Sequence, residues 1–453
     1  MRVLMFGWEF PPNIAGGLGT ACYGLTKGLA KNGVDILFVM PAASGKEDQS
    51  AVKIINASDV EIEEMISQTH CGSQVKGESS TERDSFFERV NFLKVDSSLV
   101  PYVDPSVIVE SKKKGVERSR TFETKESEAR WWKDFKVNYG GKYKFSGKYG
   151  ANLMEEVSRY AMVAATIANE NSFDVIHAHD WLTYPAGIAA KRVSGKPLVI
   201  HVHATEFDRS GENVNTITYG IERMGMMEAD KIITVSNLTR NIVINKYGID
   251  PSKVVTVHNA VDFKETAPYE IKRGVDEKIV TFLGRITFQK GPGYFIEAAA
   301  KVLKRCDNVR FVMAGNGDLL NRSIRRVAKL GIADRFHFTG FLKGDDVKRM
   351  FAYSDVYVMP SVSEPFGISP LEAMKSNVPV IISKQSGVAE VLKYAIKIDF
   401  WDIDAMADSI YALLNYPALS HMSTEYGMKE VNALKWENAA KKIKAVYESV
   451  VGA

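Results

Sequence analysis

The sequence is poor in cysteine. Its three cysteines, Cys22, Cys71 and Cys306, lie far apart, with no CxxC pair and no Cys/His cluster at the spacing of a metal site. An odd, scattered set of thiols argues against a disulfide framework and against a zinc site. We therefore expect a reducing, cytoplasmic setting, and we expect no metal and no other cofactor.

Long apolar runs and an excess of one charge are also missing. No stretch approaches the ~18 consecutive apolar residues that span a bilayer. The N-terminal run MRVLMFGWEFPP is too short for the apolar core of a signal peptide and has no small-residue cleavage site. The formal net charge of +3 gives no general reason to expect nucleic acid or an acidic membrane surface as a partner. The composition predicts a soluble protein with no integral membrane segment and no nucleic-acid partner.

Short apolar runs that alternate with helical patterns are what the sequence does contain. The run Arg2–Phe6 is followed by a glycine loop at 16–19, a helical repeat that stops at Asn32–Gly33, and a second run, Val34–Met40. Strand, loop, helix and strand form the βαβ unit of a parallel sheet. Continuous β-branched runs indicate strands covered on both faces. The other predicted strands are 173–177, 197–203, 232–235, 254–257, 279–283, 309–314, 336–338, 356–359 and 378–382.

Two such series in one chain predict an α/β protein with two Rossmann-like, doubly wound domains. The length of 453 residues suits two or three domains of about 100–200 residues each. We place the first domain at 1–262, with an insertion at about 44–150, and the second at 263–430. An amphipathic helix at 431–453 is expected to dock back on the body. The insertion carries aromatic residues that either pack it onto the domain or stack on sugar rings: Trp131, Trp132, Phe135, Tyr139, Tyr143 and Tyr149.

Two motifs of the first half follow predicted strands. The glycine loop GGLG at 16–19 leads into a helix, where backbone N–H groups can approach an anion or a sugar; a tight packing turn explains it equally well. His179 and Asp180, in the run HAHDW, stand at the carboxyl end of a strand, where ligands of open α/β sheets bind. His201 and His203 repeat the pattern on the next strand. These histidines either line a ligand-binding cleft or have a structural role, and the sequence leaves both interpretations open. The spacing identifies no further metal ligand.

Two motifs of the second half bring charge to loops. Arg285 and Lys290 lie five residues apart in the run GRITFQKG, just after a predicted strand. Such a pair of cations can converge on a diphosphate or can be solvated at the surface. Glu364 and Glu372 lie eight residues apart in the run EPFGISPLE, which joins a strand to a helix. The prolines stiffen this loop, and Gly367 leaves room for a ligand.

Taken together, these segments resemble the glycogen- and starch-synthase group and the wider family 4 of the retaining GT-B glycosyltransferases. The matching pieces are GGL at 16–18, HDW at 179–181, GR…KG at 284–291, GNGD at 315–318 and EPFG…E at 364–372. They occur in the family's order and span nearly the whole chain. The most specific of these motifs are EPFG…E at 364–372 and the Arg285/Lys290 pair. The resemblance implies a GT-B fold, in which two Rossmann-like doubly wound domains face each other across a cleft.

The resemblance also implies roles for single residues. Arg285 and Lys290 would hold the diphosphate of a nucleotide-sugar donor and neutralise the leaving group. Glu364 would contact hydroxyls of the transferred sugar, Glu372 those of the ribose, and His179 the region of the anomeric carbon. The other residues implied in substrate binding are Gly16, Gly17, Asp180, Gly315, Asn316, Leu342, Phe366, Gly367 and Ile368.

The implied reaction is retaining transfer of a hexosyl group, glucosyl first among them, from a UDP- or ADP-sugar to a hydroxyl acceptor such as an α-glucan end, without a metal. One departure argues against a strict synthase: the Lys of the Lys-x-Gly-Gly-Leu motif is replaced by Ile14. A lipid- or small-molecule-directed transferase of the same family and a nucleotide-sugar-binding protein without turnover remain alternatives. An NAD-dependent dehydrogenase is disfavoured because no GxGxxG followed by an acidic residue is present.

Overall fold

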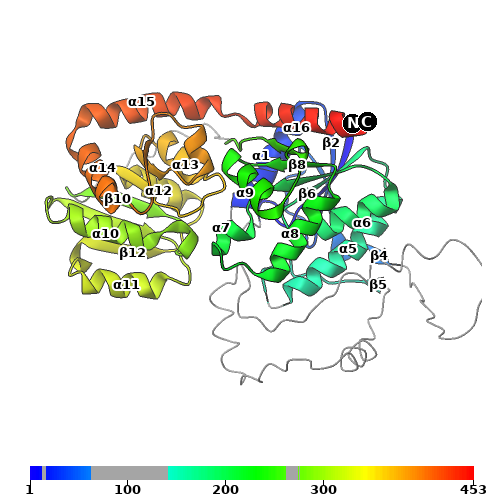
Figure 1. Ribbon diagram of the computed structural model, residues 1–453, viewed down its shortest axis with the longest axis horizontal. Helices are drawn as coiled ribbons and strands as arrows, with labels where there is room; N and C mark the ends of the chain where they lie inside the picture. The colour runs from blue at the N-terminus through cyan, green and yellow to red at the C-terminus, as the bar shows by residue number, and fades with distance from the viewer. Residues whose placement is uncertain (13–16, 63–140, 151, 262–273, 275, 453) are drawn as a thin grey trace, which may run out of the picture.

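The chain forms two α/β halves joined side by side (Figure 1). The structure is a computed structural model that describes residues 1–12, 17–62, 141–150, 152–261, 274 and 276–452. Each half is built on one parallel sheet with helices on both faces. Within the described residues, no helix combines the length and the apolar character needed to cross a membrane.

The first sheet has the strand order β3-β2-β1-β6-β7-β8-β9, and all of its pairs are parallel. β1 lies in the middle, where Leu4 pairs with Leu37 of β2 and with Ile176 of β6. Its side chains alternate between two buried layers, as expected for a strand covered on both faces. The strands are β1 (Arg2–Phe6), β2 (Asp35–Met40), β3 (Lys53–Asn56), β6 (Val175–His179), β7 (Leu198–Val202), β8 (Lys231–Thr234) and β9 (Val254–Thr256).

Helices cover both faces of the first sheet. One layer is packed by α5, α6, α8 and α9, and the opposite layer by α1 together with the C-terminal helix α16. A small antiparallel pair, β4 (Glu61–Ile62) and β5 (Gly141–Lys142), lies beside α5. The helices of this half are α1 (Gly17–Lys31), α5 (Leu153–Glu170), α6 (Tyr184–Ser194), α7 (Glu206–Ser210), α8 (Thr216–Glu228) and α9 (Asn237–Tyr247), with short 3₁₀ turns η1 (Ala57–Asp59) and η2 (Pro251–Lys253).

The second sheet has the order β12-β11-β10-β13-β14-β15, again entirely parallel. Its strands are β10 (Lys278–Leu283), β11 (Val309–Ala314), β12 (Phe336–Gly340), β13 (Val356–Met359), β14 (Val380–Ser383) and β15 (Ile396–Ile398). Its helices are α10 (Pro292–Val302), α11 (Leu320–Lys329), α12 (Asp345–Tyr353), α13 (Ser369–Lys375) and α14 (Ile403–Asn415), with 3₁₀ turns η3 (Phe288–Lys290), η4 (Ala333–Arg335) and η5 (Gly387–Glu390).

The last two helices connect the halves. α15 (Pro417–Ala433) runs along the second half, and α16 (Trp436–Val451) continues onto the first half, so that the two chain ends lie close together (Figure 1). α16 packs against α1, where Trp436 fills the space left by Gly24 and Gly28. The apolar face of α16 thereby completes the core of the first half.

The predicted insertion at 44–150 needs a correction at its start. Lys53–Asn56 is an edge strand of the first sheet, because its β-branched residues Ile54 and Ile55 pair in parallel with Phe38 and Val39 of β2. Near the other end of the insertion, Tyr143 packs in the core and supports the packing interpretation of this aromatic residue. Residues 63–140, with Trp131, Trp132, Phe135 and Tyr139, lie outside the described part of the chain, as does the predicted domain boundary at 262/263.

Candidate functional site

In each sheet, successive strands are added first on one side of the first strand and then on the other. In the first sheet, β2 and β3 lie on one side of β1, and β6 to β9 lie on the other. In the second sheet, β11 and β12 lie on one side of β10, and β13 to β15 lie on the other. In open α/β sheets, ligands bind beyond the carboxyl ends of the strands at this switch point. The loops that leave β1, β6, β10 and β13 carry the four motifs picked out in the sequence. The fold therefore brings two of these motifs to the carboxyl end of the first sheet and the other two to the carboxyl end of the second.

The loop after β10 is pressed against the end of β13. Gly291 has φ 65°, and a Cβ there would lie 2.1 Å from the carbonyl oxygen of Pro360, so no larger residue fits. Arg285 is exposed, and its Nη2 donates to Oε1 of Gln289 at 3.1 Å. η3 ends at Lys290, whose side chain is directed toward the loop after β13.

Lys290 and Glu364 form an ion pair between these two loops. Nζ of Lys290 donates to Oε2 of Glu364, and Oγ of Ser361 donates to the same oxygen at 3.2 Å. The two charged side chains are only 19% and 9% exposed, so water screens the pair less than it would at an open surface. The cation of the GRITFQKG motif is thus in direct contact with the carboxylate of the EPFGISPLE motif.

The rest of the EPFGISPLE run surrounds this pair. Phe366 is buried, and Gly367 adopts φ 97°, with its Cβ position 3.1 Å from Cγ of Glu364. Glu372, on α13, is half-buried, and this burial raises the pKa of its carboxyl above the usual value. Ile368 faces the first half of the chain: its Cδ1 lies 3.9 Å from where Gly17 would carry a Cβ. The glycine loop and the EPFG loop therefore meet across the boundary between the halves.

The loop after β11 completes this side of the site. Gly315 is buried with φ 144°, and a Cβ on it would lie 1.8 Å from the carbonyl oxygen of Gly284. Asn316 is exposed, and its Oδ1 accepts from the backbone N–H of Gly317 at 2.8 Å. Leu342 is half-buried and packs against the core of the second half. Gly315 thus packs against the loop that carries Arg285.

A polar network holds α7 of the first half against the EPFG loop. Ser363 donates to Oδ1 of Asp208 at 2.5 Å across the boundary, and burial raises the pKa of the Asp208 carboxyl. Arg209, next in the chain, donates to Glu206 at 3.0 Å and to Glu222. Asp208 lies in none of the motifs picked out in the sequence.

A second contact between the halves centres on Glu390. Its carboxylate accepts from the backbone N–H groups of Asn237 and Leu238 at 2.9 and 2.8 Å, at the start of α9. It also lies 2.7 Å from Nε2 of His258. Nothing in the spacing of the sequence pointed to Glu390, because its partners lie more than 130 positions away.

The histidines at the ends of β6 and β7 form one stack. His177, His179 and His201 are fully buried, and His203 is half-buried. Burial lowers the pKa of all four imidazoles, to about 3 for His177 and His203, so that they are neutral at physiological pH. In this conformation His179 has no exposed side-chain surface, so direct contact with a sugar requires the residues that cover it to move.

Asp180 ties the two strands together at this edge. It has φ 60°, and its Oδ1 accepts from the backbone N–H of His203 at 2.8 Å and of Ala204 at 3.3 Å. Burial raises the pKa of Asp180 to about 7. These contacts are the ones expected of a residue that shapes the loop. Gly16, also predicted to bind substrate, lies outside the described residues.

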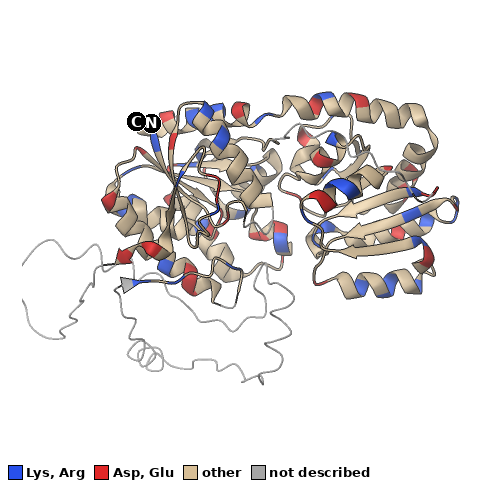
Figure 2. Cartoon of the chain, turned by 180° about the vertical axis from the view of Figure 1, so that it is seen from behind, with Lys and Arg blue, Asp and Glu red and all other residues tan. Residues whose placement is uncertain are grey.

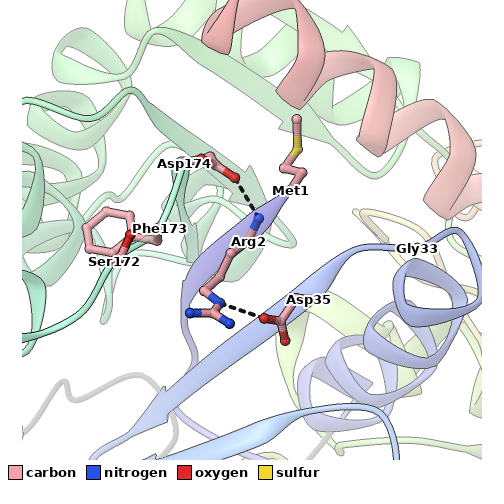
Figure 3. A pocket seen from close by; sticks show the side chains of 7 residues that line it. All are labelled: Met1, Arg2, Gly33, Asp35, Ser172, Phe173 and Asp174. Atoms are coloured by element: carbon pink, nitrogen blue, oxygen red, sulfur yellow. Dashed lines mark hydrogen bonds and ion pairs between the residues drawn. The ribbon is translucent and has the colours of Figure 1, made fainter.

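Among the described residues, the distribution of charge singles out no other site. Basic and acidic side chains are interspersed over both halves (Figure 2). A shallow pocket at the amino ends of β1 and β2 is lined by Met1, Arg2, Asp35 and Asp174, among others (Figure 3). Its polar groups are paired with one another, since Arg2 binds Asp35 at 2.5 Å and Asp174 at 2.7 Å. It also lies at the wrong end of the sheet for a substrate site.

Comparison with known proteins bears on both halves. A model of the glycosyltransferase family 4 matches residues 138–265, and a model of the glycosyl transferases group 1 matches residues 263–430. An uncharacterized glycosyltransferase of Methanocaldococcus jannaschii is 27% identical over 99% of this chain and 98% of its own length. The UDP-Gal:alpha-D-GlcNAc-diphosphoundecaprenol alpha-1,3-galactosyltransferase of Escherichia coli is 28% identical over 63% of this chain and 78% of its own.

The same fold is found in a solved structure with bound nucleotide. The Anabaena protein HepE, in complex with UDP and glucose, superposes with a TM-score of 0.65 at 16% identity, over 99% of this chain and 100% of its own. At this identity the likeness concerns the fold alone. It agrees with two Rossmann-like domains in the GT-B arrangement.

Proposed function

Because the chain belongs to the group 1 and family 4 glycosyltransferases and has the GT-B fold, we propose that it moves a hexosyl group from a nucleotide diphosphate sugar to a hydroxyl acceptor with retention of configuration. UDP-glucose is the first donor to test, with ADP-glucose second. The protein works without a metal in this proposal, and the described residues supply the charges that the reaction needs. The acceptor class is considered separately below.

One observation carries the proposal: Lys290 lies on Glu364, beside Arg285, at the edge where the two halves meet. Two cations from one loop and a carboxylate from the next suit a ligand that has a dianionic diphosphate joined to a polyhydroxylated ring. Guanidinium and ammonium groups bind phosphate oxygens, whereas a carboxylate accepts hydrogen bonds from sugar hydroxyls.

The ion pair has a consequence for donor binding. While Lys290 is paired with Glu364, each of the two charges is compensated by the other. A diphosphate that enters beside Arg285 competes for the ammonium group and releases the carboxylate to accept sugar hydroxyls. The pair therefore keeps two half-buried charges compensated until the donor replaces both interactions, since an uncompensated buried charge is costly.

In this proposal, Lys290 and Arg285 act on the bond that is broken during transfer. The bond between the anomeric carbon and the diphosphate oxygen breaks, and its electron pair goes to that oxygen. Lys290 and Arg285 stabilise the charge that develops there, which is the main source of rate in such a site. The acceptor hydroxyl attacks from the same face of the sugar, and its proton passes to the leaving phosphate. Glu372 holds the ribose, and the 315–317 loop with Leu342 seats the base.

The acceptor is either an α-glucan end or a lipid-linked or small-molecule hydroxyl. The absence of the synthase lysine at Ile14 and the similarity to a transferase whose acceptor is a diphosphoundecaprenol-linked sugar favour the second class. The motifs themselves favour the glucan as acceptor. The assay described next distinguishes the two acceptor classes.

Released nucleotide, measured for a panel of donors against glycogen, maltooligosaccharides and lipid-linked acceptors, tests the proposal. We expect turnover with UDP-glucose or ADP-glucose and a product whose new linkage is α by NMR. Turnover that is stimulated by liposomes and absent with glucans would select the lipid acceptor. No hydrolysis and no transfer with any common nucleotide sugar would overturn the proposal, and a β-linked product would overturn retention.

A further inference from the structure

A cluster of aromatic side chains lies in the turn after β15 and at the start of α10. Trp401 is 56% exposed, and its ring meets that of Phe400 edge to face, with centroids 4.8 Å apart at 86°. The ring of Tyr294 meets Phe400 at 5.1 Å and 67°, and both of these residues are half-buried. We call these three residues the aromatic shelf. Apolar side chains that cluster at a surface, unlike single exposed ones, mark sites of interaction.

One residue, Gln385, connects the shelf to the carboxylate of the candidate site. Its backbone carbonyl accepts a hydrogen bond from the N–H of Glu364 at 2.9 Å. Its side-chain amide donates to Asp399 at 2.9 Å and accepts from the N–H of Phe400 at 3.4 Å. The turn that carries Phe400 is closed by a hydrogen bond from the N–H of Asp402 to the carbonyl of Asp399 at 2.9 Å. The shelf is thus held on a fixed turn beside the EPFG loop.

Tyr294 connects the shelf to the cation of the same site. It follows Lys290 by four residues, and its N–H donates to the carbonyl of Gly291 at 3.1 Å. Its Cδ2 lies 3.2 Å from where Gly291 would carry a Cβ, so its ring packs directly on the end of the GRITFQKG loop. The shelf therefore begins beside the loop that we propose to bind the diphosphate.

The order of the strands gives the direction in which the shelf lies. In the proposed function, on which this inference rests, the base lies at the loops after β11 and β12, the diphosphate at the loop after β10, and the sugar at Glu364, after β13. The sheet continues in the same direction through β14 to β15, and its strands are all parallel, so their carboxyl ends share one edge. The shelf therefore lies beyond the sugar end of the donor, on the side away from the nucleotide.

The chemistry of the shelf suits a sugar ring. The C–H faces of a pyranose are apolar and stack on aromatic rings, whereas its hydroxyls need polar partners. Charged groups of both signs surround the shelf: Lys384 is 55% exposed and pairs with Asp399 at 2.9 Å, and Asp402 is exposed as well. An anionic membrane surface would call for an excess of cations, which these residues do not provide.

We propose that the aromatic shelf binds a sugar ring of the acceptor, which is then an oligosaccharide chain rather than a small hydroxyl compound. The end of the chain receives the transferred sugar, and a ring further along the chain stacks on Trp401. Trp401 thereby determines the length of acceptor that is preferred and takes no part in the chemical step. The rings are the same in a free glucan and in a lipid-linked oligosaccharide, and the acceptor panel described above distinguishes these two sources.

Saturation-transfer NMR tests the shelf without any measurement of activity. The probes are maltoheptaose, cellohexaose and chitohexaose, with glucose as the short control. We expect at least one chain to bind the wild type, and Trp401→Ala to weaken that binding about fivefold, as for the loss of one aromatic contact. Trp401→Phe should recover part of it. Tyr416→Ala, which removes an exposed aromatic residue at the opposite end of α14, is the matched control and should bind like the wild type.

The outcomes that overturn the shelf are distinct. Equal binding to the wild type and to Trp401→Ala overturns it, as does the absence of binding for all three chains to the folded wild type. If Trp401→Ala turns a dimer into a monomer by ultracentrifugation and leaves sugar binding unchanged, the shelf is a contact between copies and the proposal fails. Circular dichroism and an unchanged affinity for UDP establish that the variants are intact.

The transfer assay adds a second readout. Trp401→Ala should raise the KM for the preferred chain about fivefold and leave kcat and the KM for the donor unchanged. An unchanged KM for the chain contradicts the role of Trp401 in acceptor binding. Oligosaccharide binding that depends on Trp401 in a protein that transfers no sugar would overturn the proposed function and leave the shelf as a sugar-binding site.

Discussion

Lys290 shows how one side chain serves two purposes. It compensates the charge of Glu364 in the structure, and in the proposed reaction it binds the diphosphate. A substitution at this position therefore changes both stability and turnover. The two effects can be separated, because only the first disappears when Glu364 is neutralised as well.

Lys290→Met should lower kcat/KM by roughly 10²–10³, the usual cost of removing one preorganised charge contact. It should also lower the free energy of unfolding, since it leaves the 9%-exposed Glu364 without its cation. Adding Glu364→Gln should recover the stability but not the turnover. Lys301→Met, which removes a surface pair with Asp404, is the matched control and should change neither. Equal turnover in Lys290→Met and wild type would contradict the catalytic role.

In the proposed function, Glu372 makes donor binding depend on pH. Burial raises its pKa, so the carboxylate that we propose to accept ribose hydroxyls becomes protonated at a higher pH than an ordinary glutamate does. The KM for the donor should rise as the pH falls through this raised pKa and should be constant above it. Glu372→Gln should have a high KM with no acid limb. A wild-type profile that is flat down to the ordinary glutamate range would contradict this role.

The sequence predicted which residues lie at the candidate site, but it did not predict which residues they contact. The motifs predicted that Arg285, Lys290 and Glu364 gather at strand ends, and the structure places the last two in contact. The pairing of Ser363 with Asp208 joins residues 155 positions apart that lie on different halves of the molecule. Contacts of this kind depend on how the two halves pack, which local patterns do not encode.

At the scale of elements, α16 fastens the end of the chain onto the first half. Trp436 lies against α1 at Gly24, where a Cβ would approach its Nε1 to 2.1 Å. The apolar periodicity predicted this helix and its apolar face. It did not predict which surface the helix covers, because the small residues of α1 that accept it lie some 400 positions earlier.

Gly24→Ala tests this packing. Alanine gains about 1 kcal/mol of helix propensity over glycine, but overpacking against Trp436 costs about 1–3 kcal/mol. We expect a net loss in the free energy of unfolding, measured by urea denaturation. Gly220→Ala, on the exposed face of α8 with no atom within 4 Å of the new Cβ, should be stabilising by about 0.5–1 kcal/mol. Stabilisation by both substitutions would show that α16 does not press on Gly24.

Strand prediction succeeded for the strands buried on both faces and for the edge strands β9 and β12, and it missed the edge strands β3 and β15. The central strands β1, β10 and β13 appear as continuous apolar runs. The edge strands β3 and β15 are short, and β3 is only partly buried, so neither carries that signal. The sequence therefore predicted two parallel sheets but assigned Lys53–Asn56 to an insertion.

At the scale of the whole molecule, Glu390 holds the halves together. It accepts two backbone N–H groups at the start of α9 and contacts His258. In the proposed function, the groups that bind the donor come from both halves, so we expect the halves to close over it. The contacts of Glu390 and of Asp208 are thus expected to set the balance between closed and open forms.

Glu390→Gln should shift this balance toward the open form. The loss of the charge at a helix N-terminus weakens the contact by about 1 kcal/mol. We expect a larger radius of gyration by small-angle X-ray scattering and a higher KM for the donor. Glu430→Gln is the control: Glu430 also accepts two backbone N–H groups, of Lys393 and Tyr394, but within one half. An unchanged radius in Glu390→Gln, or an equal increase in the control, would contradict this account.

The most direct test of the whole account is equilibrium binding of nucleoside diphosphates. UDP, ADP and GDP are titrated into the wild type, into Arg285→Met/Lys290→Met and into the control Lys301→Met, with the corresponding nucleosides alongside. The account predicts that the preferred diphosphate binds the double variant at least tenfold more weakly, while the nucleoside and the control are unaffected. Equal affinity of the diphosphate for wild type and double variant would contradict the claim that these two cations hold the donor between the halves.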